Sequence, residues 1–331
     1  MHDFGFIFNL ILDVSGFDRG VESHAWPGFD MPEILPIGGG KGGVGKSFIT
    51  ASVGALIARQ GYKVLLVDLD LGASNLHTFL GIRSPETGLG NFLNKGVPSL
   101  DDVVMPTLVT NLYFISSCNC SMEIANLFHA QKVKLISAIR KLAFDFVFID
   151  LGAGTSFNTI DFFLTANKGM VICTPEPISL ENNFRFIRAV YLRRLKNLIK
   201  RLDFDPTVKA AISNSGKKLF SSRELFNRVK VYNPEMLDDL KARIGGFEFI
   251  FLLNQLRKHS DADLGGKIQT VCNRHFYSPF VFLGNVYFDA HVHEAVYQNE
   301  MFVTRFPNTN TAMELMSIAE LLSYHAMVDS G

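Results

Sequence analysis

The chain has 331 residues, of which 47% are hydrophobic and 19% are charged, so it can bury a large core and falls within the length of a single α/β domain. Lysine plus arginine and aspartate plus glutamate total 32 each, and the formal net charge of zero indicates no whole-molecule attraction to nucleic acid or to an anionic membrane. Four scattered cysteines exclude a disulfide-stapled scaffold, and no stretch has the form of a secretory signal, so we expect a reduced, cytoplasmic protein.

An N-terminal extension is expected over residues 1–33, ahead of a domain that spans residues 34–331. Within it, residues 6–12 read FIFNLIL, a run that is too short to span a bilayer and lacks the basic residues of a signal peptide. Two interpretations stay open. The run is a short segment that docks on the body of the protein or on a partner, or translation starts at Met31 and the extension is not made.

Short apolar runs then alternate with longer helical stretches, which is typical of a mostly parallel, twisted sheet with helices on both faces. The candidate strands span residues 33–37, 63–68, 112–116, 144–150, 169–174, 247–254 and 280–287. Between the first two, residues 47–60 carry small and apolar residues at helical spacing and stop before Gly61. The sequence therefore predicts the α/β class, opening with a strand, a glycine-rich loop and a helix.

A basic stretch stands out in this neutral chain. From Arg185 to Lys230 there are thirteen lysines and arginines against three acids. Residues 184–202 place apolar side chains along one face and most basic side chains elsewhere, which predicts a basic amphipathic helix. This helix is a candidate surface for a protein effector, although a solvated helix that covers the sheet fits the pattern equally well. Residues 203–246 are expected to form a basic helical insertion, to which no role can be assigned.

Residues 40–47 read GKGGVGKS and satisfy the phosphate-loop pattern G-x-x-x-x-G-K-[ST] between a predicted strand and a predicted helix. Glycines allow backbone dihedrals that a Cβ forbids, so successive N–H groups can turn toward phosphate oxygens, and the helix N-terminus adds positive potential. Lys46 is expected to reach the β- and γ-phosphates of ATP, and the Ser47 hydroxyl to ligate Mg²⁺. The predicted cofactor-binding residues here are Gly40, Gly42, Gly43, Val44, Gly45, Lys46, Ser47 and Phe48.

Residues 41–47 resemble the deviant Walker A motif, K-G-G-x-G-K-[ST], of the MinD/ParA group of P-loop ATPases. The resemblance implies that Lys41 reaches the nucleotide of a second copy, so that ATP is sandwiched in a homodimer. Two phosphate sites that face each other need cations from across the interface, which an isolated monomer does not supply. It also implies Mg²⁺-dependent ATP hydrolysis, slow without a partner, with Lys41, Lys46 and Asp70 as catalytic residues.

Two later segments match this group in the same order. Residues 68–75 read DLDLGASN and resemble switch I, D-x-D-x-G-x-x-N; the resemblance implies that Asp70 orients the attacking water and that Asp68 supports Mg²⁺ through its shell. A helix-capping acid is the alternative for either residue. Residues 150–154 read DLGAG and resemble the Walker B and switch II run, in which Asp150 faces Mg²⁺ through water.

Two further matches are less specific. Asn254 resembles the strand-end residue that contacts adenine, and Asp289 resembles a residue near the nucleoside, while a purely structural role is as good an interpretation of either. Two positions depart from the group. Pro36 cannot donate a ladder hydrogen bond, which suggests a locally irregular strand pairing. Phe48 stands where many relatives have threonine, so a side-chain contact to the α-phosphate is expected to be missing.

Other features separate the members of the group. Members that carry iron-sulfur clusters place cysteines after switch II, and none lies within residues 150–160. Cys118 and Cys120 form a C-x-C without a second nearby pair, which more often lines a loop than binds a metal. The tail from Thr311 to Gly331 has no lysine or arginine, so we expect a docked last helix and no integral membrane association.

The runs IGGG at residues 37–40, DLDLG at 68–72 and LGNVYFD at 283–289 most resemble the FleN/FlhG branch of flagellar-number regulators. This implies a spatial or numerical regulator of a structure such as the flagellum, recruited through a partner to a polar or membrane-bound structure. An alternative is a ParA-like partitioning ATPase whose basic stretch binds DNA phosphates without sequence preference. A metabolic ATPase is a third hypothesis, for which the sequence identifies no small-molecule pocket.

Overall fold

The computed structural model describes residues 32–71, 74–117, 120, 129–201, 226, 229–231 and 234–329. The extension predicted for residues 1–33 therefore lies outside the described residues as far as Met31, and so does most of the insertion predicted for residues 203–246. Of that insertion, the structure describes chiefly helix α10, which spans Pro234–Gly245.

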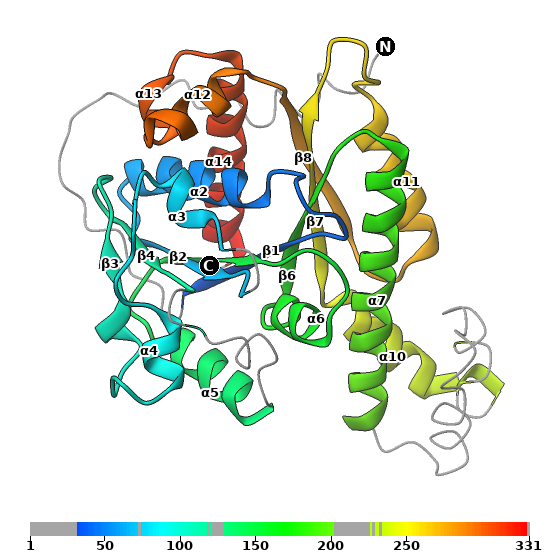
Figure 1. Ribbon diagram of the computed structural model, residues 1–331. Coiled ribbons are helices and arrows are strands. Elements are labelled where there is room, and N and C mark those ends of the chain that lie inside the picture. Colours follow the sequence, from blue (N-terminus) through cyan, green and yellow to red (C-terminus); the bar gives the residue numbers. More distant parts are fainter. Residues whose placement is uncertain are drawn as a thin grey trace. The chain divides into compact units, whose positions relative to one another are not determined.

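Within the described residues, eight strands form one sheet in the order β3-β4-β2-β5-β1-β6-β7-β8 (Figure 1). All neighbouring strands are parallel except β3 and β4, which are antiparallel. The strands are β1 (Glu33–Gly38), β2 (Val64–Leu69), β3 (Met105–Pro106), β4 (Leu112–Ile115), β5 (Phe146–Leu151), β6 (Lys168–Cys173), β7 (Glu248–Leu256) and β8 (Phe280–Tyr287). The predicted α/β class is confirmed, and so are all seven predicted strands. Strand β3 was not predicted, because two residues are too few to show an alternating pattern.

Helices cover both faces of the sheet (Figure 1). On one face lie α2 (Lys46–Arg59) and α14 (Asn310–Asp329), which pack on each other and on the sheet, together with α3 (Leu76–Phe79), α12 (His291–Gln298) and α13 (Phe302–Arg305). The remaining described helices are α4 (Leu89–Leu93), the single 3₁₀ turn η1 (Asp101–Val103), α5 (His129–Ile139), α6 (Phe157–Phe163), α7 (Pro177–Arg201), α10 and α11 (Leu264–His275). Because both faces are covered, the central strands are apolar along almost their whole length.

The pairing of β1 shows the effect of Pro36. Strand β1 pairs with β5 over five successive residues, from Glu33 to Ile37, but with β6 at only two, Ile37 and Gly38. The N–H of Glu33 points to the β5 side, where it donates to Asp145, so alternate residues including Pro36 face β6. The irregular pairing expected at Pro36 is therefore confined to the β6 side, where its missing N–H leaves a short ladder.

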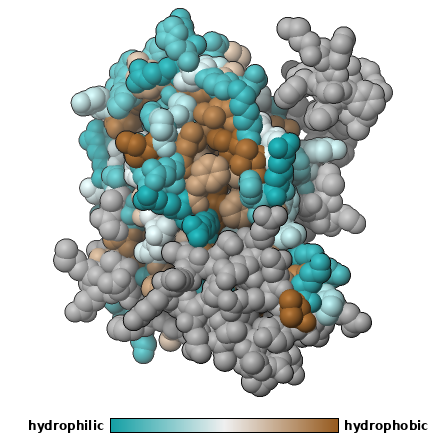
Figure 2. Space-filling view, turned by 90° about the vertical axis from the view of Figure 1, so that its right-hand side faces the viewer, coloured by the Kyte–Doolittle hydropathy of each residue, from teal (hydrophilic) through white to brown (hydrophobic). Residues whose placement is uncertain are grey.

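Strand β8 forms one edge of the sheet, and most of its side chains are only partly buried. Figure 2 shows an apolar patch on the side of the molecule that carries this edge in Figure 1. The backbone of the edge is occupied by side chains of α11. Asn273 pairs with both the N–H and the carbonyl of Phe280, and Gln269 accepts the N–H of Phe282 at 2.8 Å. Such capping removes the free backbone groups that another strand would need for pairing.

Helix α14 is the docked last helix that the sequence predicts for the tail. It packs against both α2 and β8, and Leu315, Ile318 and Ala319 are buried in these contacts. Across the described residues, none of the helices has the combined length and apolarity needed to cross a membrane.

Candidate nucleotide-binding site

The phosphate loop runs from the carboxyl end of β1 to the N-terminus of α2. Gly43 and Gly45 have φ values of 75° and 90°, in the left-handed region where a side chain would be strained. Gly45 is the N-cap of α2, and among the described residues no side chain caps the first turn of this helix. The unpaired N–H groups of that turn are available to an anion, which the helix dipole also favours.

Lys46 is the first residue of α2 and is only 8% exposed. Burial lowers the pKa of its ammonium group, while the charges of Asp150 and Asp70 act in the opposite direction. A buried cation at the start of a helix, next to loop N–H groups, is suited to a polyanionic ligand.

Asp68 and Asp150 come from the adjacent parallel strands β2 and β5 and are register partners. Burial, above all, raises the pKa of Asp150 to about 7, and the charge of Asp68 adds to it, while the Ser47 hydroxyl and Lys46 act in the opposite direction. Even so, neither carboxylate oxygen of Asp150 has a hydrogen bond of regular geometry with any described residue, although the Ser47 hydroxyl lies close to it. A buried carboxylate that lacks partners is expected to bind a cation or ordered water.

Asp68, by contrast, is held by the protein. Its carboxylate accepts hydrogen bonds from the N–H of Asp70 at 3.0 Å and from the Ser74 hydroxyl at 2.6 Å. Burial still dominates and raises its pKa to about 6. Asp68 is therefore placed to shape the chain that follows β2 and the field around Asp150, while its role toward a metal ion stays a prediction.

A cavity of about 740 Å³ opens beside the loop, a size suited to a ligand as large as a nucleotide. The predicted site residues that line it are Gly42, Gly43, Gly45, Lys46, Ser47, Phe48, Asp70, Asn254 and Asp289. Gly40, Lys41, Val44, Asp68 and Asp150 are not among its lining residues. Phe48 is buried, and its ring packs on the rings of Phe79 and Phe302. Its side chain therefore helps to hold α3 and α13 against the start of α2.

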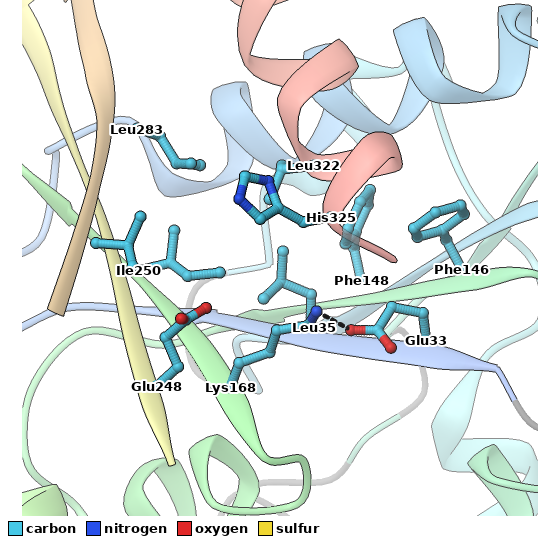
Figure 3. A pocket seen from close by; sticks show the side chains of 11 residues that line it. Glu33, Leu35, Phe146, Phe148, Lys168, Glu248, Ile250, Leu283, Leu322 and His325 are labelled. Atoms are coloured by element: carbon cyan, nitrogen blue, oxygen red, sulfur yellow. Dashed lines mark ion pairs between the residues drawn. The ribbon is translucent and has the colours of Figure 1, made fainter. Parts of the chain in front are cut away.

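A much smaller hollow lies at the opposite, amino-terminal end of the strands (Figure 3). His325 of α14 and the apolar side chains Leu35 and Ile250 border it, and an ion pair of 2.8 Å joins Lys168 to Glu33. Its volume of about 20 Å³ holds roughly one water molecule. The larger cavity is therefore the better candidate for a ligand.

Asn254 and Gln255 support the phosphate loop from the end of β7. The Asn254 side-chain N–H donates to the Val44 carbonyl at 2.8 Å, and that of Gln255 donates to the Gly43 carbonyl at 3.2 Å. A Cβ on Gly45 would lie 2.2 Å from Nδ2 of Asn254. The structure thus places Asn254 against the loop, and its contact with adenine stays a prediction.

Asp289 lies at the far end of the cavity, with aromatic and imidazole groups around it. Its Oδ1 accepts a hydrogen bond from the N–H of His291 at 2.9 Å and lies 2.7 Å from Nδ1 of the same residue. Phe288 lines the same end, and the Arg257 guanidinium lies 4.7 Å from the centre of its ring. His293 also lines it. A flat, apolar group such as a nucleobase fits these surroundings better than a phosphate does.

The sequence did not single out several residues that the structure brings to the site. Gln255, Phe79 and His293 line the cavity, and Asn183 of α7 accepts the N–H of Gly40. Only Gln255 had a sequence signal, through its position next to Asn254. The others come from helices whose packing no motif encodes.

Lys41 is partly buried and makes no hydrogen bond or ion pair with any residue that the structure describes. In the basic helix α7, by contrast, two arginines are bonded within the protein. Arg193 binds Asp161 of α6 through two hydrogen bonds of 2.9 and 3.2 Å, and Arg194 donates to the Arg243 carbonyl at 2.7 Å and lies over the Phe247 ring. The predicted helix is confirmed within α7, but these two arginines anchor it to the protein.

Only one cysteine of the C-x-C pair can be placed: Cys118 lies outside the described residues, and Cys120 is half-buried. In the described part of the chain, no group of three or more histidine, cysteine or acidic side chains is arranged to hold a metal ion. A magnesium ion that keeps most of its waters and binds phosphate oxygens needs no such group.

Comparison with known proteins agrees with this site. The model of the CobQ/CobB/MinD/ParA nucleotide binding domain matches residues 35–302. The chain is 28% identical over 175 residues to a putative septum site-determining protein MinD of Chlorella vulgaris, covering 52% of this chain and 62% of that protein. It is 29% identical over 158 residues to the MinD protein of Helicobacter pylori, covering 47% of this chain and 58% of that protein. The chain thus spans about six-tenths of the length of these curated relatives.

Two solved structures show the same fold. The MinD protein of Pyrococcus horikoshii, complexed with Mg-ADP, has a TM-score of 0.61 at 19% identity and covers 90% of this chain and 98% of its own. A ParA family ATPase from Chlorobium tepidum has a TM-score of 0.57 at 16% identity and covers 87% and 98%. The match of the family model over most of the sequence shows that the chain belongs to the CobQ/CobB/MinD/ParA nucleotide-binding family.

Proposed function

We propose that this protein binds ATP with Mg²⁺ in the 740 Å³ cavity and hydrolyses it slowly, as a switch between a monomer and an ATP-bound homodimer. The observation that carries the proposal is the buried carboxylate of Asp150, which has no partner among the described residues and lies next to Lys46 and Ser47. This arrangement fits a hydrated Mg²⁺ ion, with Ser47 as direct ligand and Asp150 acting through water.

Different residues of the site have different roles in binding and hydrolysis of ATP. The loop N–H groups and Lys46 hold the β- and γ-phosphates, and Asn254 and Gln255 keep the loop in place through their bonds to Val44 and Gly43. Mg²⁺, when bound, neutralises charge on the phosphate oxygens. Asp70 lines the cavity directly after the end of β2, within switch I, from where its carboxylate can accept a hydrogen bond from the attacking water and orient it.

Lys41 supports the dimeric part of the proposal. It lies within the loop, yet it is not among the residues that line the cavity of its own subunit. No described residue neutralises its charge, so its ammonium is available to the phosphates of a second copy, as the resemblance to the deviant Walker A motif implies.

Biologically, we place the protein among spatial or numerical regulators of a cytoplasmic or membrane-associated structure, with the flagellum as first candidate. Its ATP-bound dimer would recruit a protein effector through the outer face of α7, where Phe184, Arg185 and Arg188 are exposed. The motif runs at residues 37–40, 68–72 and 283–289 support this branch. A septum-related role, after the MinD relatives, has the same ATP chemistry but a different effector.

ParA-like DNA partitioning remains the second candidate. Exposed Arg188 and Lys196 on α7 favour it, since both are available to phosphates of DNA. Arg193 and Arg194 give no such support for DNA binding, because their side chains are hydrogen-bonded within the protein. Binding that weakens with salt at a log–log slope of about −0.9 per phosphate contact would identify this mode.

The test is isothermal calorimetry with a non-hydrolysable ATP analogue, with and without Mg²⁺. We expect magnesium-dependent binding by the wild type, and at least a roughly hundredfold weaker affinity for Lys46→Ala, because a buried charged partner of the phosphates is lost. Lys141→Ala, which changes an exposed lysine outside the cavity, is the matched control. A wild-type protein without magnesium-dependent affinity contradicts the proposal.

A further inference from the structure

The first residue of the phosphate loop is attached to a distant helix. The N–H of Gly40 donates to Oδ1 of Asn183 in α7 at 2.9 Å, although the two residues are 143 positions apart in the sequence. Asn183 is only 2% exposed. A buried polar group such as the Asn183 oxygen costs about 1–3 kcal/mol when it loses its hydrogen-bond partner, so this bond constrains the start of the loop.

The loop and the helix also touch through their backbones. A Cβ on Gly40 would lie 2.0 Å from the carbonyl oxygen of Asn182, and a Cβ on Gly39 would lie 3.0 Å from Oδ1 of Asn183. Gly40 could not carry a side chain without moving the backbone of α7, whereas a Cβ on Gly39 would be tight against the Asn183 side chain and the Ile172 carbonyl of β6. Glycine at position 40 is therefore required by the close approach of the helix, beyond any demand from a ligand.

The orientation of the Asn183 amide is fixed from its other end. Its Nδ2 donates to the Ser179 carbonyl at 3.0 Å, which turns the oxygen toward Gly40. The Ser179 hydroxyl in turn accepts the N–H of Thr174, at the end of β6, at 3.1 Å. All three side chains are buried. The chain of bonds thus ties the loop, α7 and the adjacent strand into one unit.

We infer that Asn183 is a positioning residue for the nucleotide site, one that fixes the base of the phosphate loop and makes α7 part of its support. The inference deepens the proposed ATP binding and rests on it. Asn254 and Gln255 hold the loop at Val44 and Gly43, near its tip, and Asn183 holds its beginning. The direction of the loop N–H groups, on which phosphate binding depends, is set by these attachments.

The test combines nucleotide affinity with a direct view of the Gly40 amide. In Asn183→Ala we expect the affinity for a magnesium-bound ATP analogue to fall about tenfold, the equivalent of ~1.4 kcal/mol. Amide exchange at Gly40, followed by NMR in the absence of nucleotide, should speed up by at least about tenfold. Asn197→Ala, a change roughly 21 Å farther along the same helix, should alter neither property.

A purely structural role for Asn183 would lower the unfolding midpoint and leave the affinity of the folded protein unchanged. Asn183→Asp retains an oxygen that can accept the Gly40 N–H, so Gly40 should stay protected in this variant even if Asn183→Ala folds poorly. The inference is overturned if folded Asn183→Ala keeps the wild-type affinity, whether or not Gly40 loses protection, or if Asn183→Asp loses that protection. If the wild type binds no nucleotide, the proposed function fails, while the amide exchange still decides whether Asn183 anchors the loop.

Discussion

Asp68 and Asp150 face each other as register partners on β2 and β5, yet the protein satisfies only one of them. Asp68 accepts hydrogen bonds from Asp70 and Ser74, whereas both oxygens of Asp150 lack a partner among the described residues. Burial raises the pKa of both carboxyl groups, to about 6 for Asp68 and about 7 for Asp150, and the charge of Asp68 adds to the rise at Asp150. Because only Asp150 lacks hydrogen bonds to described residues, a bound cation should stabilise its carboxylate more than that of Asp68.

The first prediction concerns the stability of Asp150→Asn without nucleotide or Mg²⁺. The pKa of Asp150 is about 7 in the folded protein against an ordinary value of 3.8, so the folded state binds an extra proton between these pH values. The free energy of unfolding of the wild type therefore falls as the pH rises from about 4 to about 7. Asn has no ionised form whose burial is unfavourable, so the variant should be more stable than the wild type by on the order of 4 kcal/mol at pH 8, and nearly equal to it at pH 3.

Urea titrations at both pH values measure this difference. In a second experiment Mg²⁺ and an ATP analogue are added. They should stabilise the wild type far more than the variant, because a cation next to the Asp150 carboxylate offsets the free-energy cost of burying its charge. A variant that is less stable than the wild type at pH 8 without ligand would show that Asp150 is satisfied by a contact within the protein.

The second prediction is that Asp70→Ala traps the ATP-bound dimer. Asp70 lines the cavity without being one of the loop groups that hold phosphate, so its loss should reduce turnover by about a hundredfold or more and leave the affinity for ATP within about threefold. Phosphate release measures turnover, calorimetry with an ATP analogue measures affinity, and light scattering in ATP measures the trapped dimer. Equal losses of affinity and turnover would place Asp70 in ligand binding instead of water activation.

The sequence predicts the strands and the phosphate loop well, but it does not predict the distant residues that hold the loop in place. The strands and the phosphate loop were predictable because buried parallel strands are continuous apolar runs and because the loop residues lie next to each other in the chain. The contacts of Asn183 with Gly40 and of Asn254 with Val44 were not, since they join residues 143 and 210 positions apart. Arg193 shows the same limit: its charge was visible in the sequence, but its bonds to Asp161 arise only when α6 and α7 pack together.

The third prediction is that Lys41→Ala abolishes ATP-dependent dimerisation while nucleotide still binds. The ammonium of Lys41 has no partner among the described residues and its side chain does not line the cavity, so the monomer loses little when it is removed. Light scattering with and without an ATP analogue measures the association, and calorimetry measures the binding. Lys141→Ala again serves as the control. Normal dimerisation of Lys41→Ala would show that the lysine plays no part across the interface.

The fourth prediction separates anchoring from surface charge on α7. Arg193→Glu replaces two hydrogen bonds to Asp161 with repulsion, so we expect a loss of about 1–3 kcal/mol in unfolding free energy. Arg188→Glu reverses an exposed charge on the same helix and should cost less than about 0.5 kcal/mol. DNA retention at low salt is then measured on Arg188→Glu, whose fold is intact. The same measurement is made on the double variant that carries both Arg188→Glu and Lys196→Glu. Unchanged DNA retention in the double variant would rule out DNA binding through α7.

The last prediction uses two glycines of the phosphate loop that differ in their surroundings. Gly43 and Gly45 both have left-handed φ values, so an added Cβ strains either position by about 1–2 kcal/mol. A Cβ at Gly43 meets nothing within 4 Å, whereas a Cβ at Gly45 would lie 2.2 Å from Nδ2 of Asn254. Gly45→Ala must therefore also displace the hydrogen bond from Asn254 to Val44, and it should destabilise the protein more than Gly43→Ala.

A double variant tests the cause of that difference. Asn254→Ala removes the group that the new Cβ would strike, so adding it to Gly45→Ala should cost less than it does in the wild-type background. The coupling free energy from the four unfolding curves measures this, and we expect about 1 kcal/mol in favour of the double variant. If the two changes in unfolding free energy are strictly additive, the cost of Gly45→Ala comes from the backbone strain of the loop, and the Asn254 side chain moves away from the new Cβ without cost. In that case Asn254 is mobile enough to leave Val44 when a nucleotide arrives, which is what a contact with adenine would require.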